Sequence, residues 1–224
     1  MSDESIFREV DEALRHERFK ALWDKYGAYV LLGAFLIVAV VGGYNGWTYW
    51  QAKQASEAGT RFVNALQLEE DGKREESIAA FQELVDDGPR GYRSLARFQV
   101  AAGFAKSGDL QGAVKAYDEL AADGSVNELM QGYAAVQAAS LRVDHAGMDE
   151  MKERLGALAI SGSPWRHSSR ELLGLAAFRN GDNEEAERLF GQLLSDQAAP
   201  QNLKLRAEMM LALLVKSNPA AAGQ

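Results

Sequence analysis

The chain has 224 residues, a net charge of −8 and no cysteine, with 47% apolar and 25% charged residues. The missing thiols exclude a disulfide scaffold and a cysteine-ligated zinc site. With 32 acidic and 24 basic residues, the chain lacks the excess positive charge that phosphate contacts need, which argues against a nucleic-acid partner. The mean hydropathy of −0.26 is typical of a soluble protein, but this average conceals how the apolar residues are distributed.

The first 25 residues predict a short amphipathic helix. Apolar residues recur there at helical spacing, and they are Ile6, Phe7, Val10, Ala13, Leu14, Phe19, Leu22 and Trp23. Two interpretations remain open for residues 1–25: a helix that lies on the inner leaflet of a membrane, and a docking helix for a cytoplasmic partner. Seven acidic side chains in this segment weaken its attraction to lipid, so neither interpretation is preferred.

Residues 26–50 predict a transmembrane helix that serves as an uncleaved signal anchor in the lipid bilayer. No charged residue occurs between Lys25 and Lys53, and about 20 apolar residues suffice to cross a bilayer core of about 30 Å. Aromatic residues prefer the headgroup layer at both ends of such a span. We therefore expect the membrane-interface anchors to be Trp23, Tyr26, Tyr44, Trp47, Tyr49 and Trp50.

A buried core helix and a cleaved signal peptide are the alternatives to an anchor. A signal peptide has an apolar region of about 7–15 residues that ends at small residues, whereas the bulky Trp47 and Trp50 close this segment. Gly42 and Gly46 form a small-xxx-small pair, which allows two helices to approach closely. A homodimer through this pair is a further, weaker prediction.

Lysine and arginine counts predict the orientation of the span. Residues 1–25 hold five basic residues and residues 51–65 hold two, so we expect the N-terminus in the cytoplasm. Residues 51–224 then lie on the far side of the membrane, which in a bacterial inner membrane is the periplasm. The lack of cysteine is compatible with an oxidising compartment.

Four segments of residues 51–224 match one another, and the repetition predicts an α-solenoid. They begin at Gly72, Gly108, Ala146 and Gly181, with spacings of 36, 38 and 35 residues. Each predicts a turn followed by a helix of three or four turns. A preceding helix fits before each turn, at residues 54–70, 91–106, 126–143 and 165–179. The unit resembles the tetratricopeptide repeat, whose period is about 34 residues.

Small and large residues keep the same spacing within the second helices. The small residues are Ser77, Ala113 and Ala186, with Met151 at the same position of the third copy, and the large ones are Phe81, Tyr117, Leu155 and Phe190. The third copy is degenerate, because Ala146 replaces the turn glycine and Met151 the small residue. In the first helices, the motif usually has a large apolar residue at a position where this chain has Arg61, Arg97 and Arg170. This departure leaves the register of the first helices open.

Residues 203–217 predict a fifth helix that caps the stack. Because Met209 to Val215 is apolar on every side, a contact with another protein or an insertion into the solenoid groove is the alternative. The overall expectation is an all-α protein with a single transmembrane helix, an α-solenoid of about four degenerate tetratricopeptide-like hairpins and a capping helix.

No residue pattern predicts an active site, a metal site or a cofactor. The three histidines, His16, His145 and His167, lack metal-ligand spacing, and no phosphate-binding glycine loop of the P-loop type occurs. Ser163, His167, Ser168 and Ser169 cluster at a helix start. A capping Ser163 beside an exposed His167 is the expected arrangement there, so we predict a protein that is not an enzyme.

Solenoids of helical hairpins present a concave surface built mainly from their first helices. The predicted partner-binding groove is lined by Phe62, Leu66, Leu95, Phe98, Tyr133, Val136, Leu175 and Phe178. An apolar groove of this kind suits an extended or unfolded chain, or a helix of a partner. Packing between the helices is the alternative for these residues, since a register shift of one residue turns them inward.

The whole arrangement resembles the ancillary Sec translocon subunit family, often called YfgM-like. The resemblance is carried by Gly46-Trp47-Thr48-Tyr49-Trp50 and by the stretch from Trp165 through Leu172-Leu173-Gly174 to Gly181-Asp182 and Ala186. Residues 7–27 are similar to the alphaproteobacterial branch, whose tail differs from the enterobacterial one. The resemblance implies association with Sec translocon subunits and with a membrane-anchored periplasmic prolyl-isomerase-like chaperone.

The resemblance also implies a role in holding unfolded secretory chains as they emerge. The leading hypothesis is therefore a membrane-anchored binding module that assists protein export at the Sec translocon. A structural scaffold or assembly factor for another envelope complex is the alternative. Because the cytoplasmic tail departs from the enterobacterial pattern, no regulatory role of that tail is expected to carry over.

Overall fold

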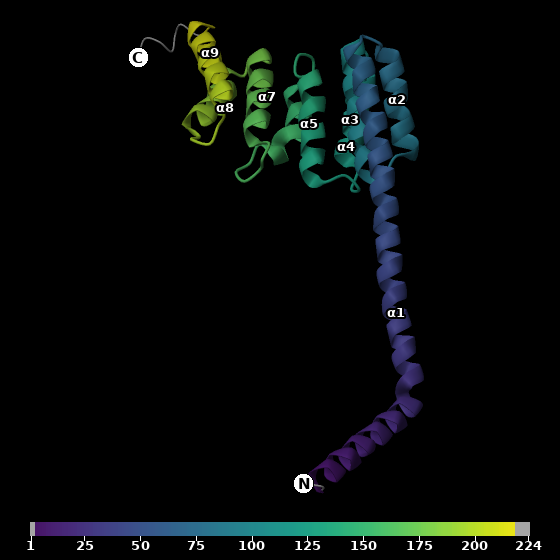
Figure 1. The fold of residues 1–224 in the computed structure, drawn as a ribbon. Coiled ribbons are helices and arrows are strands. Elements are labelled where there is room, and N and C mark those ends of the chain that lie inside the picture. The colour runs from purple at the N-terminus through teal and green to yellow at the C-terminus, as the bar shows by residue number, and fades with distance from the viewer. Residues whose placement is uncertain (1–2, 218–224) are drawn as a thin grey trace. The chain divides into compact units, whose positions relative to one another are not determined.

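The computed structural model describes residues 3–217, and the side chains of Lys20, of residues 23–29 and of residues 31–216. Every regular element in this range is a helix (Figure 1), which confirms the all-α prediction. The helices are α1 (Asp3–Glu70), α2 (Arg74–Asp87), α3 (Arg90–Ser107), α4 (Leu110–Ala122), α5 (Glu128–Arg142), α6 (Met148–Leu155), the 3₁₀ helix η1 (Gly156–Leu158), α7 (Arg166–Arg179), α8 (Asn183–Ser195) and α9 (Gln201–Ser217).

Helix α1 runs without interruption from Asp3 to Glu70. The helix predicted at 54–70 is therefore the continuation of the apolar helix, because no proline or turn sequence separates the two. Most side chains of the predicted amphipathic pattern lie outside the described residues, namely Ile6, Phe7, Val10, Ala13, Leu14, Phe19 and Leu22. The amphipathic character of residues 1–25 thus stays a prediction.

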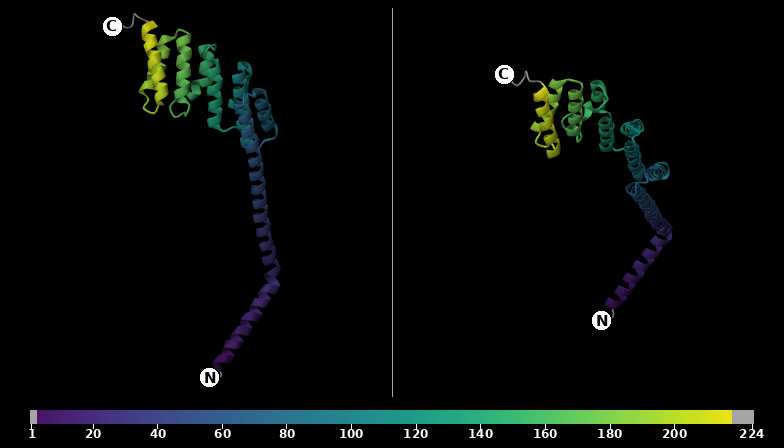
Figure 2. Two further views of the ribbon diagram at one scale, coloured as in Figure 1. Left: turned by 45° about the horizontal axis from the view of Figure 1, so that its top comes forward. Right: turned by 90° about the horizontal axis from the view of Figure 1, so that it is seen from above.

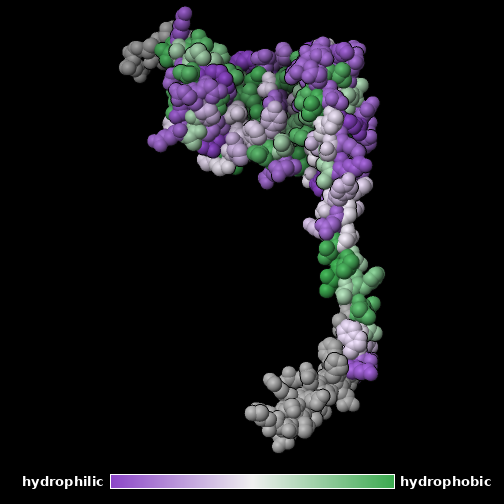
Figure 3. Space-filling model, viewed as in Figure 1, coloured by the Kyte–Doolittle hydropathy of each residue, from purple (hydrophilic) through white to green (hydrophobic). Residues whose placement is uncertain are grey.

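Among the described residues, one stretch within α1, Trp23–Glu70, is long and apolar enough to cross a membrane. Only 6% of its most apolar 18-residue window is buried, and Phe35 and Ile37 are 69% and 67% exposed. A core helix of a soluble protein would bury such side chains, so their exposure contradicts that alternative. Figure 3 shows the apolar side chains covering this part of α1. Length, composition and exposure together support a membrane anchor.

The four predicted hairpins are present in the second of the two compact units, Ala58–Gln224. They consist of the C-terminal part of α1 with α2, then α3 with α4, α5 with α6, and α7 with α8. Both views in Figure 2 show these helices side by side in a row. Helix α9 packs on α8 and α7 at the end of the row, which confirms the predicted capping position.

The repeat spacing identifies the residues that fill the core between helices. The residues at the small position, Ser77, Ala113, Ala186 and the larger Met151, are all at most 3% exposed. The large residues Phe81, Tyr117, Leu155 and Phe190 are at most 5% exposed. Four apolar clusters result, each shared by neighbouring hairpins. Burial of the same position in every hairpin explains why these residues recur at a fixed spacing.

Three of the predicted turn glycines adopt the left-handed conformation that only glycine reaches without strain. They are Gly72, Gly108 and Gly181, with φ of +78°, +89° and +80°. Asp109 and Asp182 then cap the following helices by accepting hydrogen bonds from the amides of Gly112 and Glu185, at 2.9 and 3.1 Å. The Glu185 carboxylate does not complete a capping box with Asp182, because it accepts hydrogen bonds from Arg188 instead.

The third hairpin is shorter than predicted. Helix α6 spans only Met148–Leu155, and the single turn of η1 follows it, so the prediction of three or four turns is wrong here. Gly147 begins α6 without a side chain that could cap it. Gly156 follows directly and has the poorest helix propensity apart from proline, which favours an early end of the helix.

Candidate protein-binding surface

The eight predicted groove residues come in pairs from the first helices α1, α3, α5 and α7, but they differ in exposure. Leu95 is 41% exposed, whereas Val136 is 8% exposed. The other six are partly buried, and they pack against the apolar clusters or neighbouring rings: Phe62, Leu66, Phe98, Tyr133, Leu175 and Phe178. The predicted groove therefore contains both exposed residues and residues of the core.

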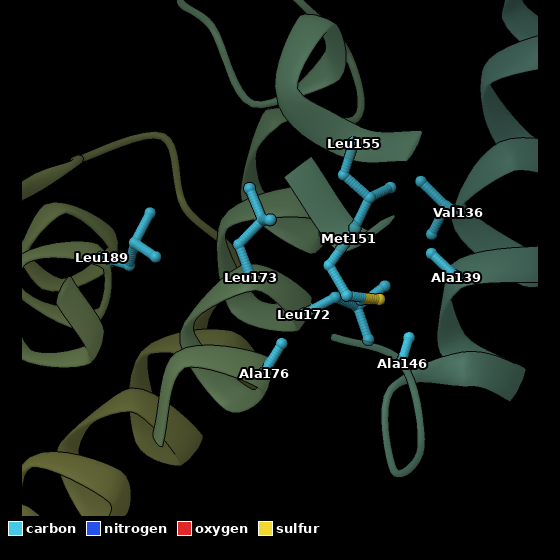
Figure 4. Packing of buried hydrophobic residues seen from close by; sticks show 9 residues of the cluster. All are labelled: Val136, Ala139, Ala146, Met151, Leu155, Leu172, Leu173, Ala176 and Leu189. Carbon is cyan, nitrogen blue, oxygen red and sulfur yellow. The ribbon is translucent and has the colours of Figure 1, made fainter. Parts of the chain in front are cut away.

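Val136 belongs to the core between α5, α6 and α7. Figure 4 shows Val136 and Ala139 of α5 pointing toward Met151 and Leu155 of α6. Leu175 and Phe178 similarly pack against the cluster between α7, α8 and α9. For these residues, packing between helices is the main role, as the alternative interpretation of the sequence anticipates.

A row of partly exposed aromatic rings crosses three successive first helices. The ring centroids of Phe98 and Tyr133 are 5.5 Å apart, and those of Tyr133 and Trp165 are 5.6 Å apart. Rings at such distances attract one another through offset or edge contacts. The indole N–H of Trp165 also donates a hydrogen bond to the Leu129 carbonyl, at 3.0 Å. This aromatic row joins α3, α5 and the start of α7 into one surface.

The aromatic row ends at a cleft of about 560 Å³ beside Trp165. The cleft lies between the start of α5 and the loop that follows η1, and its walls include Leu129, Leu158 and Ile160. Leu129 and Ile160 are 50% and 61% exposed. Exposed apolar groups that cluster next to a hollow are typical of a site for a protein or ligand. We call the aromatic row and this cleft together the tryptophan surface.

Two glycines allow aromatic rings from the following hairpin to lie close to the first helices. A Cβ atom on Gly132 would be 2.4 Å from Trp165 Cδ1, and one on Gly59 would be 2.7 Å from the Tyr92 hydroxyl. Each pair is 33 residues apart in sequence. Because these two glycines have no side chain, the Trp165 ring can lie directly on α5 and the Tyr92 ring directly on α1.

The three arginines that left the register of the first helices open each form an ion pair, and the same pair recurs in three hairpins. Each pairs with an aspartate 26 residues later, at the end of the second helix of the same hairpin: Arg61–Asp87, Arg97–Asp123 and Arg170–Asp196. Sequence reasoning missed these pairs, although the matching spacing of both residue types is visible in the sequence. They hold the first helix of each of these hairpins to the C-terminal end of its second helix, which is a structural role.

The carboxylate of Asp196 interacts with several side chains at once. Arg166 Nε is 3.2 Å and His167 Nε2 is 2.9 Å from its carboxylate. The hydrogen bond with His167 has the largest effect on the pKa of Asp196, and that with Arg166 the next largest. Together they hold this pKa well below its usual range. His167 is only 8% exposed, so the prediction of an exposed histidine is wrong; the ring is covered because it pairs with the end of α8. Ser163 does accept from the amide of Trp165, at 3.2 Å.

A second and larger cleft, of about 870 Å³, lies beside the short helix α6. Its apolar lining includes Leu110, Val114 and Leu141, and its charged lining includes Arg142 and Glu150. Arg142 Nε is 3.0 Å from Glu150, and this hydrogen bond is the main reason why the pKa of Glu150 is lowered. Because its charged groups pair with one another, this cleft offers no net charge to attract an ionic ligand. Within the described residues, no group of three or more metal-ligating side chains occurs.

Comparison with known proteins agrees with this architecture. A family model described as tetratricopeptide repeat-like domain matches residues 20–212. The ancillary SecYEG translocon subunit of Escherichia coli (strain K12) is 25% identical over 173 residues, which cover 76% of this chain and 81% of that protein. No solved structure matches the chain. The resemblance that the sequence indicates is thereby confirmed, and the chain belongs to the tetratricopeptide repeat-like domain family.

Proposed function

We propose that this protein is a membrane-anchored module that binds protein partners and assists export at the Sec translocon. The observation that carries the proposal is the tryptophan surface, on which the rings of Phe98, Tyr133 and Trp165 lead to an apolar cleft. Aromatic side chains supply most of the binding energy in many protein interfaces. The similarity to an ancillary translocon subunit supports the choice of the Sec machinery, and a role in binding rather than catalysis.

The topology proposed from the sequence suits this role. Residues 1–25 lie in the cytoplasm, residues 26–50 span the inner membrane, and residues 51–224 lie in the periplasm. The membrane-interface anchors are exposed on α1, as such a position requires: Trp23, Tyr26, Tyr44, Trp47, Tyr49 and Trp50. The anchor would keep the repeat domain at the membrane surface, where secretory chains emerge.

The proposed clients are unfolded secretory chains, and the proposed partners are translocon subunits and a membrane-anchored periplasmic prolyl-isomerase-like chaperone. An extended chain could bury its apolar side chains against Trp165 and the exposed Leu129 and Ile160. The cleft of about 560 Å³ is large enough for one or two large side chains rather than for a folded domain. Leu95, the most exposed of the predicted groove residues, would extend the contact along α3.

Site-specific photo-crosslinking in intact cells tests the proposal. A photoreactive amino acid placed at Leu129 or Leu95 should capture translocon subunits, the chaperone or secretory chains. The matched control is Gln82, which is also exposed but lies on the second helix α2. Blocking secretion should reduce the capture of secretory chains from Leu129 and leave background capture from Gln82 unchanged.

Two outcomes would contradict this function. Equal capture of secretory chains from Leu129 and Gln82 would show that the tryptophan surface is not the binding site. Affinity purification after gentle solubilisation gives the second outcome. If it recovers an unrelated envelope complex with no translocon component, the result favours the scaffold alternative.

A further inference from the structure

The last helix of the solenoid is apolar on two opposite faces. Leu203, Ala207 and Leu214 are at most 6% exposed and pack α9 onto the stack. About half a turn away on the helix, Leu205, Met209 and Leu213 are 50%, 60% and 50% exposed. Terminal elements of repeat proteins normally need a polar outer face for solubility. The outer face of α9 departs from this rule, which makes it a candidate contact surface.

This exposure is concentrated rather than scattered over the domain. From Ala58 onward, the exposed large apolar residues outside α9 are distributed over several helices and loops: Val63, Leu95, Leu110, Leu129, Met130 and Ile160. Helix α9 alone adds Leu205, Met209, Leu213 and Val215 within 17 residues. In Figure 1, α9 lies at the C-terminal end of the row of helices, where a further element could stack.

The spacing of the exposed residues suits a second copy of this chain. Leu205, Met209 and Leu213 are four residues apart and form one ridge along α9. The ridge has the same residue order in both directions along the helix, with Met209 at its centre and a leucine about 6 Å away along the axis on each side. A two-fold axis through Met209 therefore places Leu205 of one copy against Leu213 of the other. Self-complementarity of this kind is what an isologous dimer interface needs.

The charges on α9 are compatible with the same axis. In an antiparallel pair centred on Met209, each charged residue of α9 lies opposite a neutral residue of the second copy. The charged residues are Lys204, Arg206, Glu208 and Lys216, and the residues opposite them are Leu214, Ala212, Met210 and Asn202. Arg206 is already paired within its own chain with Glu171, at 2.8 Å. No like charges meet, so electrostatic repulsion does not oppose the pairing.

We propose that the outer face of α9 is a homodimer interface, in which two copies of this chain pair antiparallel about Met209. A helix of 17 residues is about 25 Å long, and one helix pair buries less than the roughly 1,600 Å² of a standard interface. The dimer is therefore weak in dilute solution. Anchoring both copies in one membrane raises their effective concentration and favours the pair.

Disulfide crosslinking in native membranes tests this interface, and the natural absence of cysteine makes every introduced thiol unique. Met209→Cys should give a crosslinked dimer on mild oxidation. Leu205→Cys and Leu213→Cys should each link poorly alone but efficiently when two differently tagged copies are co-expressed. Glu187→Cys, at an exposed site on α8, is the matched control. Adding Met209→Glu to the Leu205→Cys and Leu213→Cys pair should abolish their link, because it places two carboxylates on the axis.

Circular dichroism of each variant should match that of the parent protein, because the replaced side chains are exposed. The proposal is overturned if Met209→Cys links no more dimer than Glu187→Cys does. A link from Met209→Cys only to a different protein would assign the face to that protein and also overturn it. Equal linking of Leu205→Cys alone and of the mixed pair would exclude the antiparallel arrangement.

Discussion

The third and fourth hairpins share one repeat pattern but differ in regularity. In the fourth, Gly181 adopts the left-handed turn, Asp182 caps α8, and α8 extends for 13 residues. In the third, Gly147 cannot cap α6, and α6 ends after 8 residues. The arginine–aspartate pair of the fourth hairpin is replaced in the third by Ala135 and Ser161 at the corresponding positions.

The irregular third hairpin borders the two clefts described above. The cleft of about 870 Å³ lies between α4, α5 and α6, and α6 contributes Glu150 and Arg154 to its lining. The cleft of about 560 Å³ is lined by Leu158, the last residue of η1, and by Ile160 in the loop that follows. A network of Arg142, Glu150 and Arg154 supports α6 in place of a helix cap.

The largest expected effect concerns the regular hairpin. Phe190→Ala removes a fully buried ring that lies against Gly174, and we expect a loss of about 3–5 kcal/mol in the free energy of unfolding. The matched change in the third hairpin, Leu155→Ala, should cost less, about 2–4 kcal/mol, because fewer atoms are removed. Urea unfolding of the purified full chain in detergent, followed by circular dichroism, measures both. A larger loss for Leu155→Ala would contradict the comparison.

A second prediction tests the contact that joins the third hairpin to the fourth. Gly132→Ala forces the Trp165 ring away from α5, since the new Cβ would lie 2.4 Å from it. We expect a loss of about 1–3 kcal/mol and reduced crosslinking from Leu129. Gly59→Ala meets only the hydroxyl of Tyr92, so it should cost less and be rescued by Tyr92→Phe. Wild-type stability of Gly132→Ala would show that this close packing is unnecessary.

Acid should weaken the regular hairpins through their ion pairs. Hydrogen bonds from Ser125, and next from the Arg97 guanidinium, lower the pKa of Asp123 to about 2. A carboxyl whose pKa is lower in the folded than in the unfolded state stabilises the fold above its unfolded pKa of about 4, and this stabilisation is lost as the pH falls toward 2. Asp123→Asn should therefore reduce stability at pH 7 and flatten its decline between pH 4 and pH 2.

The midpoint of urea unfolding, measured at pH 7 and at pH 3, reports this effect. Glu119→Gln is a suitable control, because Glu119 is an exposed acid on the same helix whose single long contact, 4.0 Å to Lys115, contributes little. An unchanged pH dependence in Asp123→Asn would mean that the contacts of the Asp123 carboxylate with Ser125 and Arg97 do not stabilise the hairpin.

The smallest effects concern the helix starts. Asp182→Ala removes the cap on the Glu185 amide and should cost about 1 kcal/mol. Gly147→Asp should instead stabilise the third hairpin by a few tenths of a kcal/mol, because Gly147 has the extended backbone of a cap residue and open space around it. Thermal unfolding of the two variants should show shifts of opposite sign. A destabilising Gly147→Asp would contradict this account of the irregular hairpin.

Much of the fold could be predicted from local patterns. The uncharged run between Lys25 and Lys53 predicts an anchor by length alone. The fixed spacing of Phe81, Tyr117 and Phe190 predicts the stacked hairpins, because each residue fills the same place in its own unit. The short α6 was not predicted, since the helical pattern continues beyond Leu155 and only the weak propensity of Gly156 opposes it.

The binding surface depends more on tertiary structure. Sequence spacing placed Val136 and Tyr133 together in a groove, but packing buries Val136 and leaves Tyr133 partly exposed between Phe98 and Trp165. Tyr133 and Val136 are three residues apart, so both lie near one face of α5. The position of the neighbouring helix decides which of these two side chains is buried.

The apolar span, the period of the repeats and the positions of small and large residues can all be predicted from the sequence. These features depend on neighbours along the chain or on matching positions in successive units, so periodicity is sufficient to find them. The folded structure was needed to show that Arg97 reaches Asp123, that His167 is buried, and that the tryptophan surface ends in a cleft. Those features depend on which side chains meet across helices, and this is set by the relative placement of the helices within the repeat domain.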